Sequence, residues 1–137
     1  MKLIRKAFII LAGASLFLGC SLVIDHNKAQ ALVERLIMDL KNENYSALNS
    51  YYTSSFNESE PLEQKAEKFK RLKDTLGPIK SFSLISSKET LDSDKGINEL
   101  ELKYKVVCER VTVEETYLVI NDEGDLKIIF QNIENMK

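Results

Sequence analysis

Apolar and polar residues follow two different periods along this chain. Up to about residue 76, apolar residues recur every three or four positions, as they do on one face of a helix. From Phe82 onward they alternate with polar residues, as in strands that are buried on one face. The pair Gly77-Pro78, which is typical of a helix end, separates the two parts. The pattern therefore predicts an α+β fold in which N-terminal helices pack on an antiparallel sheet.

Three helical segments are predicted before Gly77. The first covers residues 28–41, with Asn27 as its N-cap, and a shorter one around residues 45–52 precedes a polar loop at 53–60. The third begins near Pro61. Its charged residues are expected to face solvent; they are Glu63, Lys65, Glu67, Lys68, Lys70, Arg71 and Lys73.

About four strands are predicted after Pro78. The first includes Phe82 and Leu84 and ends before a polar loop at 90–96. The second is the clearest, because Leu100, Leu102, Tyr104, Val106 and Cys108 alternate with charged residues. The others cover about residues 111–120 and 125–133, with a turn at 121–124 between them.

The register of these strands indicates one candidate site. A two-residue turn at Glu109-Arg110 would pair Tyr104 with Glu115 and Leu102 with Tyr117. A four-residue loop at 121–124 would then place Phe130 beside Glu115, the one carboxylate on an otherwise apolar face. Burial there would raise the Glu115 pKa and suit it to ligand binding or proton transfer. The alternatives are that a bulge turns Glu115 toward solvent, or that Tyr104 hydrogen-bonds it.

The chain begins with the three regions of a secretory signal. Lys2, Arg5 and Lys6 precede an apolar run at residues 7–18, which is shorter than the roughly 20 residues of a membrane-spanning helix, and Gly19-Cys20 follows. Because the uncharged stretch continues through residue 24, an uncleaved transmembrane anchor is the alternative to a cleaved signal.

The sequence Leu16-Phe17-Leu18-Gly19-Cys20 resembles the processing box of bacterial lipoproteins, although that family most often has Leu where Phe17 stands. The resemblance implies cleavage before Cys20 and acylation of this cysteine, which would anchor the protein on the extracytoplasmic side of the membrane. Ser21 would favour the outer membrane if the source is a diderm bacterium. The chain then divides into a signal peptide at 1–19, a lipidated tether at 20–27 and a single domain at 28–137.

Charge and cysteine content exclude some function classes. Residues 1–19 hold three of the 19 basic residues and no acidic ones, so the rest has 16 basic and 21 acidic residues, a formal charge of −5. This charge argues against nucleic acid as a partner. With Cys20 acylated, Cys108 has no disulfide partner and is expected to be a buried thiol. His26 is expected in the tether.

No catalytic, nucleotide-binding or metal motif stands out, so no cofactor is expected. The segment from Asp92 to Gly96 is similar to the start of a calcium loop, but Lys103 stands where the bidentate glutamate would be. We therefore expect a turn at this segment.

The order of elements, together with Asn44-Tyr45-Ser46-Ala47-Leu48, Tyr51-Tyr52 and the segment Leu76-Gly77-Pro78-Ile79-Lys80-Ser81, resembles the nuclear-transport-factor-2-like superfamily. It is similar to small lipoproteins of that group. The resemblance covers about residues 28–133 and implies a cone, in which a curved sheet wraps a long helix and leaves a pocket at its open end.

Three functions are compatible with such a cone. The favoured one is a non-catalytic envelope lipoprotein that binds a small apolar or amphipathic ligand or a protein partner. The second is an isomerase- or dehydratase-like enzyme that uses Glu115. The third is an assembly module that dimerises through the outer face of the sheet, which carries Val107, Leu118, Ile120 and Ile129.

Acylation of Cys20 can be tested directly. In a bacterial host fed labelled palmitate, we expect the wild type to incorporate label and Cys20→Ala to remain unlabelled, because the acyl group is carried by this cysteine. Equal labelling of both proteins would contradict the lipoprotein interpretation.

Overall fold

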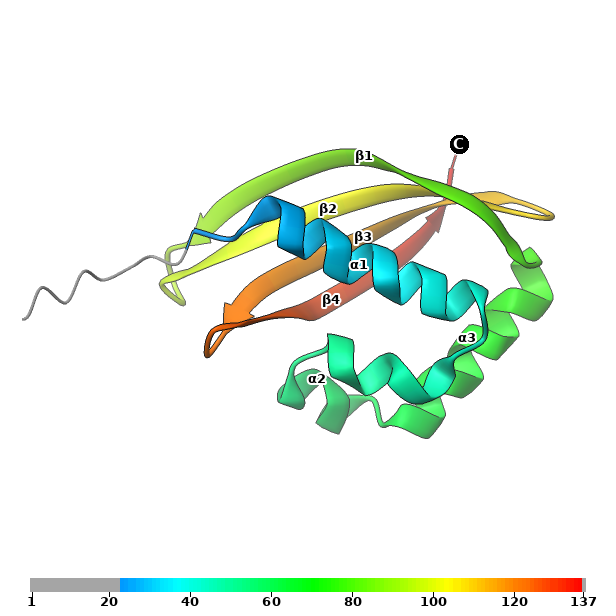
Figure 1. Ribbon diagram of the computed structural model, residues 1–137, viewed down its shortest axis with the longest axis horizontal. Helices are drawn as coiled ribbons and strands as arrows, with labels where there is room; N and C mark the ends of the chain where they lie inside the picture. The colour runs from blue at the N-terminus through cyan, green and yellow to red at the C-terminus, as the bar shows by residue number, and fades with distance from the viewer. Residues whose placement is uncertain (1–22, 137) are drawn as a thin grey trace, which may run out of the picture.

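The computed structural model describes residues 23–136 and confirms the α+β prediction. The elements are α1 (His26–Lys41), η1 (Tyr45–Tyr51), α2 (Ser54–Ser59), α3 (Leu62–Leu76), β1 (Ile79–Asp92), β2 (Ile97–Cys108), β3 (Thr112–Asp122) and β4 (Asp125–Asn135). Four antiparallel strands in the order β1-β2-β3-β4 form a curved sheet, and α1 lies along its concave face (Figure 1). After α1 the chain turns back, so that η1 packs against both α1 and α3, and α3 leads to β1. Among the described helices none is both long and apolar enough to cross a membrane.

The helix α1 supplies much of the core. Its buried residues follow the helical period and face the sheet; they are Ala29, Leu32, Val33, Leu36, Ile37 and Leu40. The predicted cap at Asn27 is wrong, because the Asp25 side chain accepts a hydrogen bond from the Lys28 N–H at 3.1 Å and starts the helix earlier. Ile24, only 1% exposed, belongs to the core, so the domain includes residues before the predicted start at Lys28.

The segment predicted as a polar loop at 53–60 contains the short helix α2 instead. The Thr53 hydroxyl caps it by accepting from the Phe56 N–H at 3.3 Å. The Phe56 ring stacks on the Tyr52 ring with 4.5 Å between centroids. The Ser, Asn and Glu residues of this segment are typical of a loop. The Thr53 cap and the stacked Tyr52 and Phe56 rings nevertheless stabilise a short helix.

Lys65 on α3 is fully buried, which contradicts its predicted place on a solvated face. Its ammonium donates to the Asn49 Oδ1 at 2.9 Å, to the Asn57 Oδ1 at 2.8 Å and to the Glu60 carbonyl oxygen. It also lies 5.1 Å from the centroid of the Tyr52 ring. Lys65 therefore ties η1, α2 and α3 into one helical unit.

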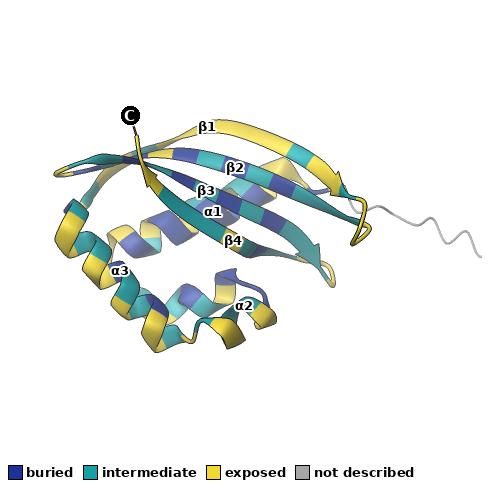
Figure 2. Cartoon of the chain, turned by 180° about the vertical axis from the view of Figure 1, so that it is seen from behind, coloured by how far each residue is buried: buried dark blue, intermediate teal, exposed yellow. Residues whose placement is uncertain are grey.

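The sheet confirms the predicted register of β2 and β3, in which Tyr104 pairs with Glu115 and Leu102 with Tyr117. Buried and partly exposed residues alternate along both strands, whereas β1 is exposed along most of its length (Figure 2). The two central strands thus supply most of the buried residues on the inner face of the sheet.

The predicted register of β3 and β4 is wrong. The turn has two residues, Glu123 and Gly124, both with positive φ, instead of the predicted four-residue loop. A register shift between Leu118 and Val119 then displaces β4 further. As a result Phe130 pairs with Leu118 and is 46% exposed, rather than lying beside Glu115.

Replacing Lys65 by methionine should destabilise the domain. Burial lowers the Lys65 pKa, which shows that burying its charge is unfavourable, but Lys65→Met leaves three partly buried acceptors without this donor. We expect a loss of about 2 kcal/mol in the free energy of unfolding, measured by urea unfolding of residues 23–137. The matched control is Lys70→Met on the exposed side of the same helix, with an expected change within about 0.5 kcal/mol. Equal effects of the two substitutions would contradict the structural role of Lys65.

Candidate functional site

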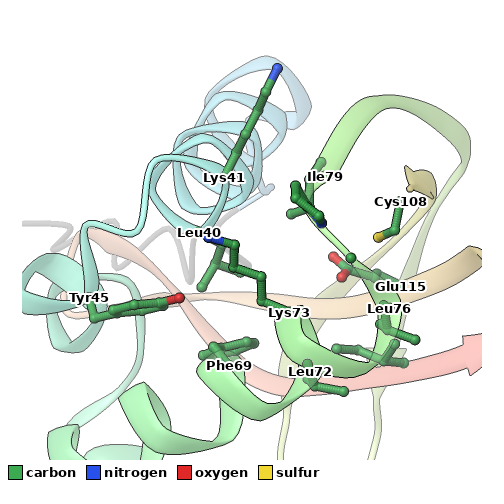
Figure 3. Close-up of a pocket in the computed structure, with 13 residues that line it drawn as sticks. Leu40, Lys41, Tyr45, Phe69, Leu72, Lys73, Leu76, Ile79, Cys108 and Glu115 are labelled. Atoms are coloured by element: carbon green, nitrogen blue, oxygen red, sulfur yellow. The ribbon is translucent and has the colours of Figure 1, made fainter. Parts of the chain in front are cut away.

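A pocket opens between the last turn of α1, the second half of α3 and the adjoining ends of β1 and β2 (Figure 3). Its cavity volume is about 50 Å³. Most of its wall is apolar and consists of Leu40, Phe69, Leu72, Leu76, Ile79 and Ile133. The pocket is therefore small, half-open and suited to an apolar group.

The Glu115 carboxyl lies at the base of this pocket. Glu115 is 5% exposed, and its oxygens point into the space that Leu40, Leu76 and Ile79 surround (Figure 3). The Tyr117 hydroxyl donates a hydrogen bond to its Oε2. Oε1 accepts no hydrogen bond from residues 23–136, and no cation there forms an ion pair with this carboxyl. One carboxyl oxygen is thus available to a ligand.

The surroundings of Glu115 set its protonation. Burial raises the Glu115 pKa to about 7, and the hydrogen bond from Tyr117 lowers it only in part. Near neutral pH the carboxyl is therefore a mixture of the protonated and the ionised form. It can donate a hydrogen bond in the first form, and in the second it can only accept one.

Of the four residues predicted to line a pocket, only Glu115 lines this one; Tyr104 and Tyr117 share its face of the sheet but do not line the pocket. Strand alternation places Tyr104, Glu115 and Tyr117 on the inner face, and both tyrosines are fully buried. The Tyr104 hydroxyl donates to Glu34 on α1 at 3.4 Å rather than to Glu115. Phe130 lies outside the site because the register shift gives its predicted place to Ile133.

A chain of hydrogen bonds leads from Glu115 across the sheet. The Tyr117 hydroxyl, which donates to Glu115, accepts from the Gln131 Nε2 at 3.3 Å. The Gln131 Oε1 in turn accepts from the Tyr52 hydroxyl at 2.6 Å. The sequence did not predict this role for Gln131, because it reaches the inner face only after the register shift. The run Ile128-Ile129-Phe130, which breaks the alternation, was the available signal.

Cys108 and two lysines complete the pocket without adding a reactive group. Burial, helped by Glu115, raises the pKa of the Cys108 thiol, which keeps it protonated and a poor nucleophile. At the rim, Lys73 forms an ion pair with Glu43 at 2.7 Å. Lys41 contributes its aliphatic part to the wall and points its ammonium away (Figure 3).

The other candidates lie elsewhere. Cys20 is outside the described residues. His26, expected in the tether, is the first residue of α1, and its Nε2 lies 3.1 Å from the Glu89 Oε2. The segment 92–96 forms the expected turn, in which an Asp92 oxygen accepts from the backbone N–H of Asp94 and Lys95. Within residues 23–136 no group of three or more His, Cys, Asp or Glu could hold a metal ion.

The fold and the site together define an α+β domain with a small apolar pocket and one buried carboxyl. No protein-family model matches this chain, and no curated protein is similar to it in sequence.

Glu115 should make stability depend on pH. Its pKa of about 7 lies above the ordinary value of 4.5, so between these pH values the folded protein keeps a proton that the unfolded chain has lost. The contribution of this group to the free energy of unfolding is therefore fully present below about pH 4.5, and it is lost as pH rises through about 7. At about 1.4 kcal/mol per pH unit, the loss approaches about 3 kcal/mol.

We expect Glu115→Gln to remove this dependence and to be more stable than the wild type at about pH 8. Urea unfolding of residues 23–137 between about pH 5 and pH 8 measures the difference. The control is Glu114→Gln. Glu114 directly precedes Glu115, lies on the opposite face of β3 and forms an ion pair with Lys103 at 3.5 Å. The same pH slope in the wild type and Glu115→Gln would show that Glu115 is not the titrating group.

Proposed function

We propose that this protein is an exported lipoprotein, anchored by lipid on Cys20, whose domain binds a small ligand without catalysing a reaction. We further propose that the domain belongs with the nuclear-transport-factor-2-like cones, because α1 lies in the concave face of a curved sheet (Figure 1). The observation that carries the binding role is the Glu115 carboxyl, which has one available oxygen at the base of an apolar pocket.

The size of the pocket restricts the ligand. An apolar cavity of about 150 Å³ holds one benzene molecule, whereas this cavity has about 50 Å³. A whole acyl chain or ring system does not fit. We propose that a short apolar end of the ligand enters, while the rest lies at the mouth near Tyr45 and the Lys73–Glu43 ion pair.

The polar group of the ligand is the second requirement. A buried ionised carboxylate without a cation is costly, so a ligand that donates a hydrogen bond or carries a positive charge offsets that cost. Amines and alcohols with a short apolar end meet both requirements, since they can donate to the Glu115 Oε1 while their carbon atoms contact Leu76 and Ile79.

One observation favours an enzyme as the second candidate. A carboxyl whose pKa is about 7 suits proton transfer at neutral pH. Acid–base catalysis generally needs further groups that activate or hold the reacting atoms, and the Tyr117 hydroxyl is the only side chain between residues 23 and 136 that hydrogen-bonds Glu115. A single carboxyl fits recognition better than turnover.

The binding role predicts that a ligand accompanies the protein. We expect mass spectrometry of full-length protein, purified from native membrane, to detect a small amine or alcohol with the wild type. Glu115→Gln should retain several-fold less of it, because the amide cannot pair with a positively charged group and binds a donor more weakly than a carboxylate does.

Glu114→Gln, whose substitution lies on the outer face of the sheet, is the matched control and should retain the wild-type amount. Equal small-molecule content in the wild type and Glu115→Gln would contradict the binding role of Glu115.

A further inference from the structure

We infer that the end of the domain where the chain enters α1 rests on the lipid bilayer, with Val23 and Leu91 in contact with it, and that the ligand pocket lies at the opposite end. The inference rests on the lipid anchor of the proposed function. It adds a contact surface and an orientation that the anchor alone does not specify.

A lipid anchor on Cys20 would hold the domain close to the membrane surface, because the chain between Cys20 and the first fixed residue of the domain is short. Ile24 is fixed, because it is 1% exposed and its backbone N–H donates to the Glu89 Oε1 at 3.0 Å. The neighbouring His26 Nε2 lies 3.1 Å from the other oxygen of Glu89. Only four residue steps separate Cys20 from Ile24, and an extended chain covers at most ~3.6 Å per residue, or ~14 Å in all. Lipid on Cys20 would hold Ile24 close to the membrane surface.

The second observation is independent of the anchor and concerns exposed apolar side chains. Val23 is 75% exposed and Leu91 is 63% exposed, whereas no other large apolar side chain among the described residues exceeds 47%. Leu91 follows Glu89 by two residues on the same face of β1, which is about 7 Å along the strand. Since Glu89 holds Ile24, the two most exposed apolar side chains lie at the same end of the domain, where the chain enters (Figure 1).

The charges at this end argue for apolar contact rather than attraction to anionic headgroups. At the β1–β2 tip, Asp92 and Asp94 outnumber Lys95, which lies 3.8 Å from Asp92. A tip without excess positive charge gains little from an anionic surface. Two exposed aliphatic side chains beside an acyl anchor can instead enter the interfacial region of the bilayer.

The orientation also determines how the pocket is reached. The 16 residues of α1 span about 24 Å. The pocket contacts Leu40 and Lys41 at the far end of this helix, and Val23 precedes its beginning. A domain that rests on Val23 and Leu91 therefore holds its pocket in the aqueous phase, and its ligand arrives from solution rather than from the lipid phase.

Site-directed spin labelling of the full-length protein tests this contact. In a Cys108→Ser background, a nitroxide is placed at Leu91→Cys or at Phe130→Cys, the matched control, which is also exposed but lies on the outer face of β4. The acylated protein is reconstituted in phosphatidylcholine vesicles, and collisions of the label with oxygen and with a water-soluble nickel chelate are measured. We expect a several-fold lower nickel collision rate and a higher oxygen collision rate at position 91 than at position 130.

Mass spectrometry of the same samples separates the two possible failures. Equal nickel collision rates at both positions, in protein that carries acyl chains on Cys20, would overturn the bilayer contact and leave the anchor intact. Protein without acyl chains on Cys20 would contradict the anchor in the proposed function, and this inference with it.

Discussion

The Glu115 carboxyl is buried in the core, and no cation among residues 23–136 forms an ion pair with it; the chemistry of the pocket follows from that placement. Strand alternation fixes the position, because Val113, Tyr117 and Val119 all turn to the same face. Turning Glu115 outward would expose those three apolar side chains. The fold therefore holds the carboxyl inside, where it binds a proton near neutral pH and leaves one oxygen facing the pocket.

Among residues 23–136, one lysine and one glutamate, Lys65 and Glu115, are buried, and their surroundings differ. Lys65 has three oxygen acceptors and two aromatic rings around its ammonium, which leaves no hydrogen of that group for a ligand. Glu115 has one hydroxyl donor and borders a cavity. The satisfied group joins three helices, whereas the partly satisfied group is the candidate for binding. Hydrogen-bond satisfaction therefore distinguishes the structural charge from the functional one.

The sequence predicted the parts of the fold that depend on local patterns. The stop at Gly77-Pro78, the alternation in β2 and the tight turn before β3 placed Glu115 correctly. The predicted register of β4 was wrong, because the loop length and the register shift are set by packing across the sheet. Lys65 was missed for a related reason: its acceptors come from η1, α2 and the residue that follows α2, so no helical period could reveal them.

Protonation of Glu115 links the stability of the domain to the kind of ligand that it binds. A ligand that donates a hydrogen bond or carries positive charge prefers the ionised carboxylate, so its affinity should rise as pH passes about 7. A ligand that can only accept needs the protonated form, and its affinity should fall over the same range. Calorimetric titration with a simple amine and with a ketone of similar size distinguishes them. Affinities that do not change between about pH 6 and pH 8 would show that Glu115 does not contact either compound.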